Sequence, residues 1–285
     1  MRKAQPSQTA AMVAAARAAH LVVDREPFIF RDTMAASLLG EQGEEIIAYH
    51  RAYGDYIVLS GTRAQVTTRA HYVERRLAEP AGGGVDQYVI LGAGLDTFAL
   101  RAPAGRPVRV FEVDHPATQR WKRELMVSAG LTTPPSLSFV PVDFETDDLM
   151  DALVAAGFDP RRPALVSWLG VTMYLTTEAI AATLAVVGRF APGSELVVEY
   201  ALPPALRDEQ ADACAEVALP AAAERGEPWL SFFAPDDLSA LLKQHRLETA
   251  EHVRQIDCVA PLLWRRQDTL RPVDLCRLAR AVVTA

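Results

Sequence analysis

Cysteine and long apolar runs are scarce in this sequence, and each scarcity excludes a class of protein. Only three cysteines occur among 285 residues, Cys214, Cys258 and Cys276, and none of them forms a CxxC pair. This spacing excludes a zinc site or a disulfide framework built on cysteine alone and favours a reducing compartment. No apolar run approaches the roughly 20 residues that a bilayer-spanning helix needs. We therefore expect no metal site, no membrane association and a cytoplasmic protein.

Positive charge is also in deficit. The chain has 29 Lys and Arg against 36 Asp and Glu, which gives a formal net charge of -7. Nucleic-acid binders draw most of their non-specific affinity from Lys and Arg at phosphates, so a nucleic-acid partner is not expected. A small anionic molecule stays possible, because one local arginine can bind it. Half of the residues are apolar, which is enough for the core of a soluble globular protein.

The chain divides into two regions with different patterns. Up to about Glu79 the signals are helical: Ser7 can cap a helix through the Ala-rich segment, and Gly40 can close a second helix that ends with Met34–Leu39. The breaker cluster Pro80–Gly84 follows. We predict an N-terminal helical cap over residues 1–80 and an α/β domain over residues 81–285, packed as one compact unit.

Beyond residue 84, short apolar segments alternate with helical ones. Helical spacing covers Thr177–Phe190, an Ala- and Glu-rich helical insert spans residues 203–228, and a further helix starts at Pro235. Apolar strands separated by helices are typical of a parallel sheet covered on both faces, so we predict a doubly wound, mostly parallel α/β fold. The expected strands are Tyr88–Leu91, Val108–Val113, Leu137–Val142, Ala164–Leu169 and Glu195–Tyr200, with Leu247–Val253 and Asp257–Leu263 as a late antiparallel pair.

A glycine loop, Gly92-Ala93-Gly94, directly follows the first expected strand. In a doubly wound sheet, ligands bind beyond the carboxyl ends of the strands, and glycine lets the backbone turn tightly there. A dinucleotide fingerprint would have a third glycine at position 97, but this chain has Thr97 preceded by Asp96. A carboxylate at that helix start repels a pyrophosphate and favours an ammonium or a sulfonium. The loop therefore favours S-adenosylmethionine over NAD.

Acidic residues end the next two expected strands. Asp114 lies 22 positions after Gly92, close to the spacing at which an acidic residue reaches ribose hydroxyls. Glu112 shares a strand face with Asp114 but stands back from the tip. Asp143 can accept from an adenine amino group, and Phe144 offers a surface to the ring. Each of these residues also has a structural alternative, a turn or a helix cap; together they predict a nucleoside cofactor.

Four segments carry a resemblance to a known family. They are Gly92–Thr97, Phe111–Pro116, Val142–Phe144 and Trp168–Leu175, supported by Ser7–Ala10, Ala15–Ala18 and the Arg63 segment nearer the N-terminus. In combination they resemble the leucine carboxyl methyltransferase family, which includes polyketide carboxyl O-methyltransferases. The resemblance covers residues 7 to about 200. It implies a class I S-adenosylmethionine-dependent methyltransferase, with residues 81–285 as the cofactor-binding domain.

The family's cofactor contacts are carried over where the residues match. The resemblance implies that Gly92, Ala93 and Gly94, with Asp96, line the methionine part. Asp114, followed by His115, would reach the ribose, and Asp143 with Phe144 would flank the adenine. Arg63 resembles the family arginine that pairs with the cofactor carboxylate. Leu169 stands where the branch that methylates protein phosphatases has Glu, and this departure favours the small-molecule branch.

The pKa of the acceptor group decides whether the site needs a catalytic base. A carboxylate, with an ordinary pKa near 4, is ionised at neutral pH and needs no base, whereas a phenol, with a pKa near 10, gains from one. His115, Tyr174 and Tyr200 are the candidate catalytic residues, and Tyr53 and Tyr56 could reach the site from the cap. None is a clear base, which favours a carboxyl acceptor.

The sequence thus predicts an S-adenosylmethionine-dependent O-methyltransferase that acts on a carboxylate or a phenol of a small-molecule metabolite. A cofactor-binding protein without catalysis and a nicotinamide-dependent oxidoreductase are the alternatives. The insert over residues 203–228 suits a lid over the acceptor or the surface of a homodimer.

Overall fold

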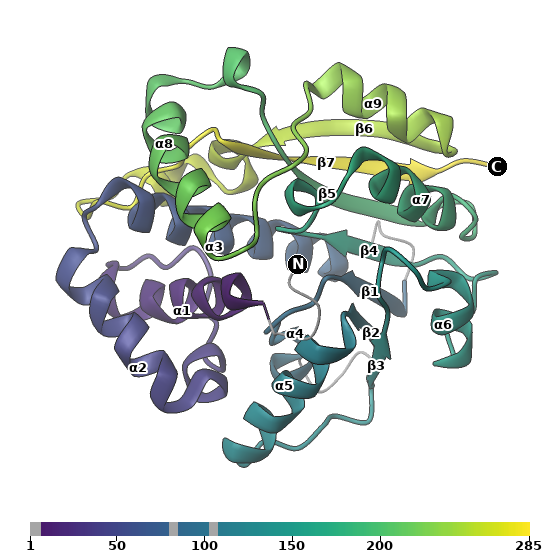
Figure 1. Ribbon diagram of the computed structural model, residues 1–285, viewed down its shortest axis with the longest axis horizontal. Coiled ribbons are helices and arrows are strands. Elements are labelled where there is room, and N and C mark those ends of the chain that lie inside the picture. The colour runs from purple at the N-terminus through teal and green to yellow at the C-terminus, as the bar shows by residue number, and fades with distance from the viewer. Residues whose placement is uncertain (1–6, 80–84, 103–107) are drawn as a thin grey trace.

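The computed structural model describes residues 7–79, 85–102 and 108–285. A seven-stranded sheet runs through it in the order β3-β2-β1-β4-β5-β7-β6 (Figure 1). Strands β1 to β5 pair in parallel, β7 is antiparallel to β5, and β6 is antiparallel to β7. The predicted doubly wound, mostly parallel sheet is confirmed. The strands are β1 Gln87–Leu91, β2 Arg109–Asp114, β3 Leu137–Pro141, β4 Leu165–Trp168, β5 Glu195–Ala201, β6 Leu247–Arg254 and β7 Cys276–Val283.

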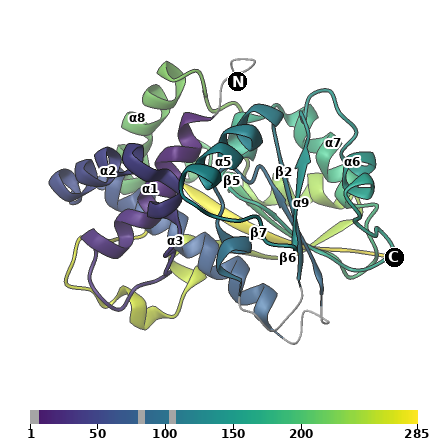
Figure 2. The same cartoon turned by 90° about the horizontal axis from the view of Figure 1, so that it is seen from below.

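Helices follow most of the strands. They are α1 Gln8–Val23, α2 Ala35–Tyr53, α3 Ile57–Ala78, α4 Phe98–Arg101, α5 Pro116–Ser128, α6 Leu149–Ala155, α7 Thr177–Val187, α8 Glu209–Glu224 and α9 Pro235–Gln244. Figures 1 and 2 show α1, α2 and α8 gathered at one end of the molecule and α6 and α7 at the other.

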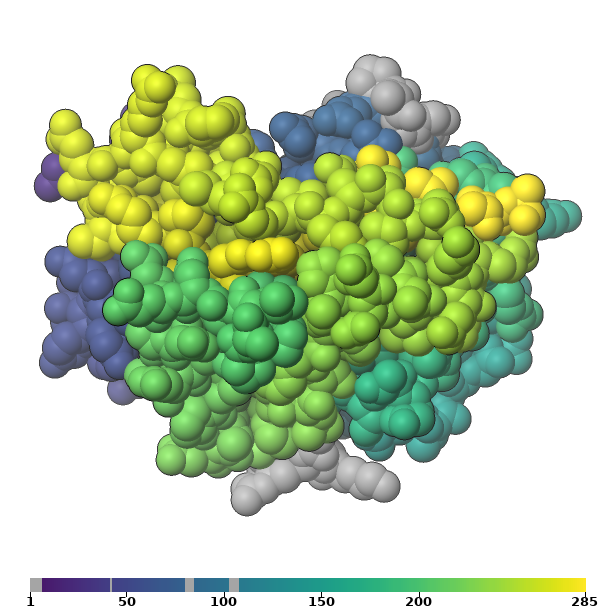
Figure 3. All heavy atoms as spheres, turned by 90° about the horizontal axis from the view of Figure 1, so that it is seen from above, coloured from purple at the N-terminus to yellow at the C-terminus, as the bar shows by residue number. Residues whose placement is uncertain are grey.

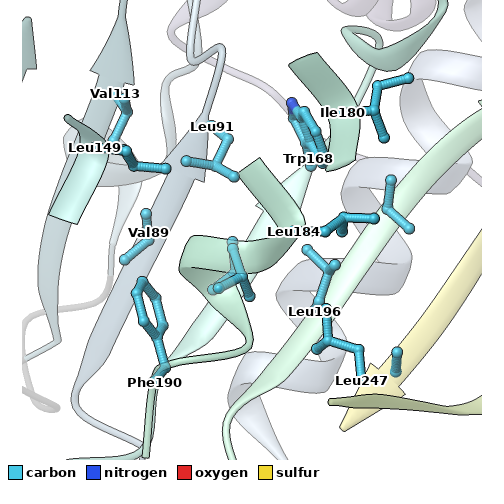
Figure 4. Packing of buried hydrophobic residues seen from close by; sticks show 14 of the residues in the cluster. Val89, Leu91, Val113, Leu149, Trp168, Ile180, Leu184, Phe190, Leu196 and Leu247 are labelled. Atoms are coloured by element: carbon cyan, nitrogen blue, oxygen red, sulfur yellow. The ribbon is translucent and has the colours of Figure 1, made fainter. Parts of the chain in front are cut away.

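Both faces of the sheet are apolar because its strands carry hydrophobic side chains at consecutive positions. In β1, Val89 and Leu91 point to the face that α6, α7 and α9 cover, whereas Tyr88 and Ile90 point to the face that α3 and α4 cover. Figure 4 shows the first of these cores, where Trp168 and Leu196 meet side chains of α7. A sheet buried on both faces is rigid, and its strand ends therefore hold loops in fixed places.

The N-terminal helices form largely as expected. Ser7 caps α1, since its Oγ accepts from the backbone N–H of Ala10 at 3.2 Å. Gly40 has a φ of +58° and breaks the regular geometry, but the helix resumes and continues to Tyr53. The helix end that was expected at Gly40 is therefore a kink within a longer helix. The boundary expected at residues 80–84 lies outside the described residues.

The prediction of a late strand at Asp257–Leu263 is wrong. This segment forms two short 3-10 turns, η4 Gln255–Cys258 and η5 Pro261–Trp264, and Pro261 has no N–H to give to a sheet. The strand that pairs with β6 is β7, in which buried and partly buried residues roughly alternate. The expected antiparallel pair exists, with its second member further along the chain.

The insert over residues 203–228 contains α8. Its residues Ala211 and Cys214 pack against Val273 and Leu275, just before β7. Figure 3 shows α8 in green beside this yellow C-terminal segment on one face of the molecule. All three cysteines are buried free thiols. In the part of the chain that the structure describes, no helix combines the length and apolarity needed to cross a bilayer.

Candidate functional site

A cavity of about 270 Å³ lies at the carboxyl ends of β1 to β4, beneath the N-terminal helices. It is where a doubly wound sheet places its ligand. Ten of the residues that the sequence nominated line it together: Gly92, Ala93, Gly94, Asp96, Asp114, His115, Asp143, Phe144, Leu169 and Tyr174.

The glycine loop takes a conformation that other residues rarely adopt. Gly92 has a φ of +66°, and its N–H and that of Ala93 donate to the carbonyl of Val113 at 2.8 and 3.0 Å. A Cβ at Gly92 would come within 2.3 Å of Val171 Cγ2. Glycine is therefore required here both by the left-handed backbone and by the close approach of the segment after β4.

Asp114 at the tip of β2 joins the loop to the second strand. Its Oδ2 accepts from the N–H of Gly94 at 2.5 Å and its Oδ1 from the N–H of His115 at 2.7 Å. Burial raises the pKa of Asp114, and these two N–H donors act in the opposite direction. The carboxylate is thus held in one orientation at the cavity wall, where it can still accept from a ribose hydroxyl.

Three residues, Asp96, His115 and Asp143, both stabilise turns or helix starts and line the cavity. Asp96 Oδ1 accepts from the N–H of Phe98 at 2.7 Å, His115 Nδ1 accepts from the N–H of Ala117 at 3.2 Å, and Asp143 Oδ1 accepts from the N–H of Glu145 at 3.1 Å. These are turns and helix caps, yet Asp96, His115 and Asp143 all line the cavity. His115 Nε2 lies 3.9 Å from Asp143 Oδ2, so the two side chains border the same stretch of wall.

Beneath the glycine loop lies a buried ion pair that sequence reasoning missed. Lys122 Nζ donates to Glu112 Oε2 at 2.5 Å and to the carbonyl of Asp96 at 2.6 Å. Burial raises the pKa of Glu112 to about 7, against the lowering effect of the Lys122 charge. The pair ties β2 to the underside of the loop. Neither side chain reaches the cavity, and nothing in the sequence links a lysine on α5 to that loop.

Arg63 does not reach the cavity, which corrects an expectation from the sequence. It is fully buried, and its Nε and Nη2 each donate to the carboxylate of Asp24 at 2.9 Å. Its Nη2 also donates to the carbonyl of Gly54 at 3.0 Å. These contacts join α1, the end of α2 and α3, so Arg63 has a structural role.

The arginine that α3 does present to the cavity is Arg69, six positions further along. Its Nη1 donates to Glu199 Oε2 at 2.5 Å, and Gly170 lies against the guanidinium. Among the described residues, its Nε and Nη2 have no hydrogen-bond acceptor. Arg69 is therefore placed to receive the cofactor carboxylate that the sequence analysis assigned to Arg63. Their shared helix made the two arginines indistinguishable from sequence.

Of the candidate tyrosines, only Tyr174 lines the cavity. Burial raises its pKa to about 12, so it remains a neutral phenol. Tyr200 is fully buried elsewhere, with its hydroxyl 2.8 Å from His252 Nδ1. Tyr53 and Tyr56 are exposed and border a separate surface hollow at the end of α2. Tyr200, Tyr53 and Tyr56 are thus not cavity residues, because strand and helix geometry points them away from it.

Thr9 and Glu227 line the end of the cavity near Tyr174, and the sequence did not nominate either. Glu227, which follows α8, is 9% exposed, and its Oε2 accepts from the N–H of Thr9 at 3.2 Å and from the Thr9 hydroxyl. The contact closes the cavity between the first turn of α1 and the segment after the insert. Residues 218 positions apart carry no local signal of such a contact.

The lining fits a nucleoside that carries a positive charge and a free carboxylate. Five carboxylates and three arginines line the cavity. Asp114 and Asp143 lie at the ends of β2 and β3, where they could hold a nucleoside, and Arg69 lies against Gly170 after β4, where it could hold a carboxylate. S-adenosylmethionine has these features, and when bound it supplies an electrophilic methyl group on a sulfonium. The residues of the chain bind and orient it and exclude water.

Comparisons with known proteins agree with this fit. A family model described as leucine carboxyl methyltransferase matches residues 10–188. A Bacillus subtilis (strain 168) protein named "Putative S-adenosyl-L-methionine-dependent methyltransferase YktD" is 33% identical over 304 residues, which cover 99% of each chain. A Mycobacteroides abscessus protein named "Putative S-adenosyl-L-methionine-dependent methyltransferase" is 34% identical over 195 residues, 67% of this chain and 63% of the relative.

A solved structure shares the fold. The crystal structure of a "putative methyltransferase" from Thermobifida fusca YX superposes with a TM-score of 0.61 at 19% identity, over 100% of this chain and 97% of the other. Together with the relatives, these matches favour an S-adenosylmethionine-dependent methyltransferase over an oxidoreductase or a binder without catalysis. The predicted enzyme class and cofactor are confirmed. By the extent of the family match and the full-length relative, the chain belongs to the leucine carboxyl methyltransferase family.

Proposed function

We propose that this methyltransferase transfers its methyl group to an oxygen atom, a carboxylate or a phenol, of a small-molecule metabolite. The observation that carries the proposal is the lining of the cavity around Tyr174. Leu175 and Leu230 contribute apolar surface there, and Thr9 and Glu227 contribute polar oxygen atoms. A pocket of this kind suits a small organic molecule with one polar group to be oriented.

Two further observations support an oxygen acceptor of small size. The matching family model is described by a carboxyl acceptor. Leu169, which stands where the protein-methylating branch has Glu, lines the cavity. Its apolar side chain supports a small metabolite over a protein tail. We extend the proposal to the cytoplasm as the place of action, since the three buried thiols are free.

Orientation supplies most of the catalysis in this proposal. Holding the acceptor oxygen close to and in line with the methyl carbon, in a cavity shielded from water, converts a bimolecular reaction into an effectively unimolecular one. The rigid strand ends fix the cofactor side through Asp114, and the helices of the cap close the other side.

The test is an activity screen with S-adenosylmethionine that carries a trideuteromethyl group. Metabolite extracts are incubated with the protein, and products are identified by mass spectrometry from the gain of the labelled methyl. We expect at least one small-molecule product labelled on oxygen, with mild base distinguishing an ester, which hydrolyses, from an ether, which does not. Label found on nitrogen, sulfur or carbon only, or no labelled product in any extract, would disprove the proposal. Asp114→Ala provides the control with impaired cofactor binding.

A further inference from the structure

The cavity has two ends with different lining. Asp114 and Asp143 mark the nucleoside end, at the carboxyl ends of β2 and β3. The sheet order places β1 and then β4 beside them. The segment after β4, with Tyr174, therefore lies on the far side of the glycine loop from the nucleoside. We call the region lined by Thr9, Tyr174, Leu175, Glu227 and Leu230 the acceptor end, because it is the part of the cavity left beyond the cofactor residues.

Glu227 is the charged side chain of the acceptor end. It is nine-tenths buried and lines the cavity. Its Oε2 caps the first turn of α1 by accepting from the N–H and the hydroxyl of Thr9. Its Oε1 has no hydrogen-bond donor among the described residues. The capping role thus uses one oxygen and leaves the other available to a ligand in the cavity.

Each arginine of the cavity has an ion pair with a carboxylate, and the donors that Arg69 has left are those placed for the cofactor carboxylate. Arg17 Nε donates to Asp32 at 2.7 Å, Arg69 pairs with Glu199, and Arg101 pairs with Glu74. None of the three has an ion pair with Glu227. A carboxylate acceptor would therefore place a second negative charge beside Glu227, which is unfavourable.

We infer that Glu227 selects an acceptor that bears a hydroxyl group, a phenol or an enol, and receives its proton during transfer. This inference rests on the proposed function and reverses the preference for a carboxylate that the sequence favoured. The acceptor O–H donates to Glu227 Oε1. An oxygen lone pair then forms the new carbon–oxygen bond as the carbon–sulfur bond breaks, its electron pair stays on sulfur, and the proton passes to Glu227. A phenol needs such a base at neutral pH, and a carboxylate does not.

Binding of matched probes tests the inference without knowledge of the natural acceptor. The protein is saturated with S-adenosylhomocysteine and titrated with three naphthalenes that differ in one group: naphthol, naphthoate and naphthylmethylamine. Their one-ring analogues are titrated in parallel. We expect each hydroxyl compound to bind about tenfold or more tightly than its carboxylate, since hydrogen bonds to buried charged groups are worth about that factor.

Glu227→Gln is the informative variant because its amide oxygen can still accept from Thr9 while its amide N–H₂ turns to the cavity. The variant should lose the preference for the hydroxyl compound or reverse it. Glu224→Gln, at the exposed end of α8, removes the same charge from the same segment and should keep the preference. Glu227→Asp keeps a carboxylate and should restore part of it. Thermal melting of each variant checks folding.

Several results would overturn the inference. They are equal or tighter binding of the carboxylate, no binding of any hydroxyl compound, tightest binding of the amine, or an unchanged preference in a folded Glu227→Gln protein. Weaker binding of S-adenosylhomocysteine in that variant, with the acceptor preference intact, would instead assign Glu227 to the cofactor. A base-labile labelled ester in the activity screen would refute the inference and leave the proposed oxygen methylation standing, so the two failures are distinguishable.

Discussion

The two ends of the cavity are built by different means. The nucleoside end, marked by Asp114 and Asp143, and the adjoining glycine loop at Gly92 lie at the ends of the neighbouring parallel strands β2, β3 and β1. The acceptor end joins the first turn of α1, the segment after β4 and the segment after α8. The first end is held by the sheet, whereas the second is held by side-chain contacts such as that of Glu227 with Thr9.

This difference in construction corresponds to a difference in function between cofactor binding and acceptor selection. Cofactor binding uses backbone geometry that the fold itself supplies, since parallel strands end at one edge of the sheet. Acceptor selection, as proposed above, depends on segments outside the sheet, whose side chains can change without disturbing the strands. Perturbing each end in turn tests whether the two functions are as separate as the structure indicates.

The largest expected effect is at the glycine loop. Gly92→Ala should lower the free energy of unfolding by about 2–5 kcal/mol, because the left-handed backbone and the contact with Val171 are both unfavourable for alanine. Gly130→Ala is the matched control: its φ is +67° and no atom lies within 4 Å of the added Cβ, so we expect about 1–2 kcal/mol. Urea denaturation measures both. Equal losses would show that the approach of Val171 is unimportant.

Asp114→Ala comes next and should affect any ligand that contains the nucleoside. Binding of S-adenosylhomocysteine and of methylthioadenosine, which lacks the amino acid, should both weaken about tenfold or more. Isothermal titration measures each, with Glu248→Gln on an exposed position of β6 as a charge control. Unchanged affinity in the folded variant would remove Asp114 from the cofactor site.

Arg69→Met should change the affinities for these two ligands by different amounts. We expect about a tenfold loss of affinity for S-adenosylhomocysteine, whose carboxylate would pair with the guanidinium, and little change for methylthioadenosine. The same titrations provide the measurement, with circular dichroism as the check on folding because Glu199 loses its ion-pair partner. If both ligands weaken alike, the variant has disturbed the cavity in general and Arg69 has no specific role toward the carboxylate.

The last prediction concerns a pH dependence beneath the loop. Since the pKa of Glu112 is raised to about 7, the folded protein retains a proton that the unfolded chain has released above about pH 4.5. Stability should therefore fall as pH rises from about 4.5 to about 7. Glu112→Gln should flatten this part of the profile in urea denaturation. A slope identical to that of the wild type would exclude Glu112 as its source.

The sequence predicted the sheet, and the gathering of the glycine loop and the acidic residues at one cavity, because their signals are local. Each strand is a short apolar run, and the loop and acidic residues follow the strands directly, as Gly92 and Asp114 show. The predictions that failed depended on orientation or on distant partners. Arg63 and Arg69 share one helix and differ only in which way they point, and β7 lay beyond the apolar run that contains Pro261.

The contact between Thr9 and Glu227 has a consequence for the growing chain. The nucleoside end lies within residues 92–144, whereas the acceptor end needs partners 218 positions apart. Contacts between such distant residues carry a high entropic cost of loop closure and form late. During synthesis, the acceptor end can be completed only after Glu227, beyond α8, has emerged from the ribosome. The segments that line the nucleoside end emerge earlier.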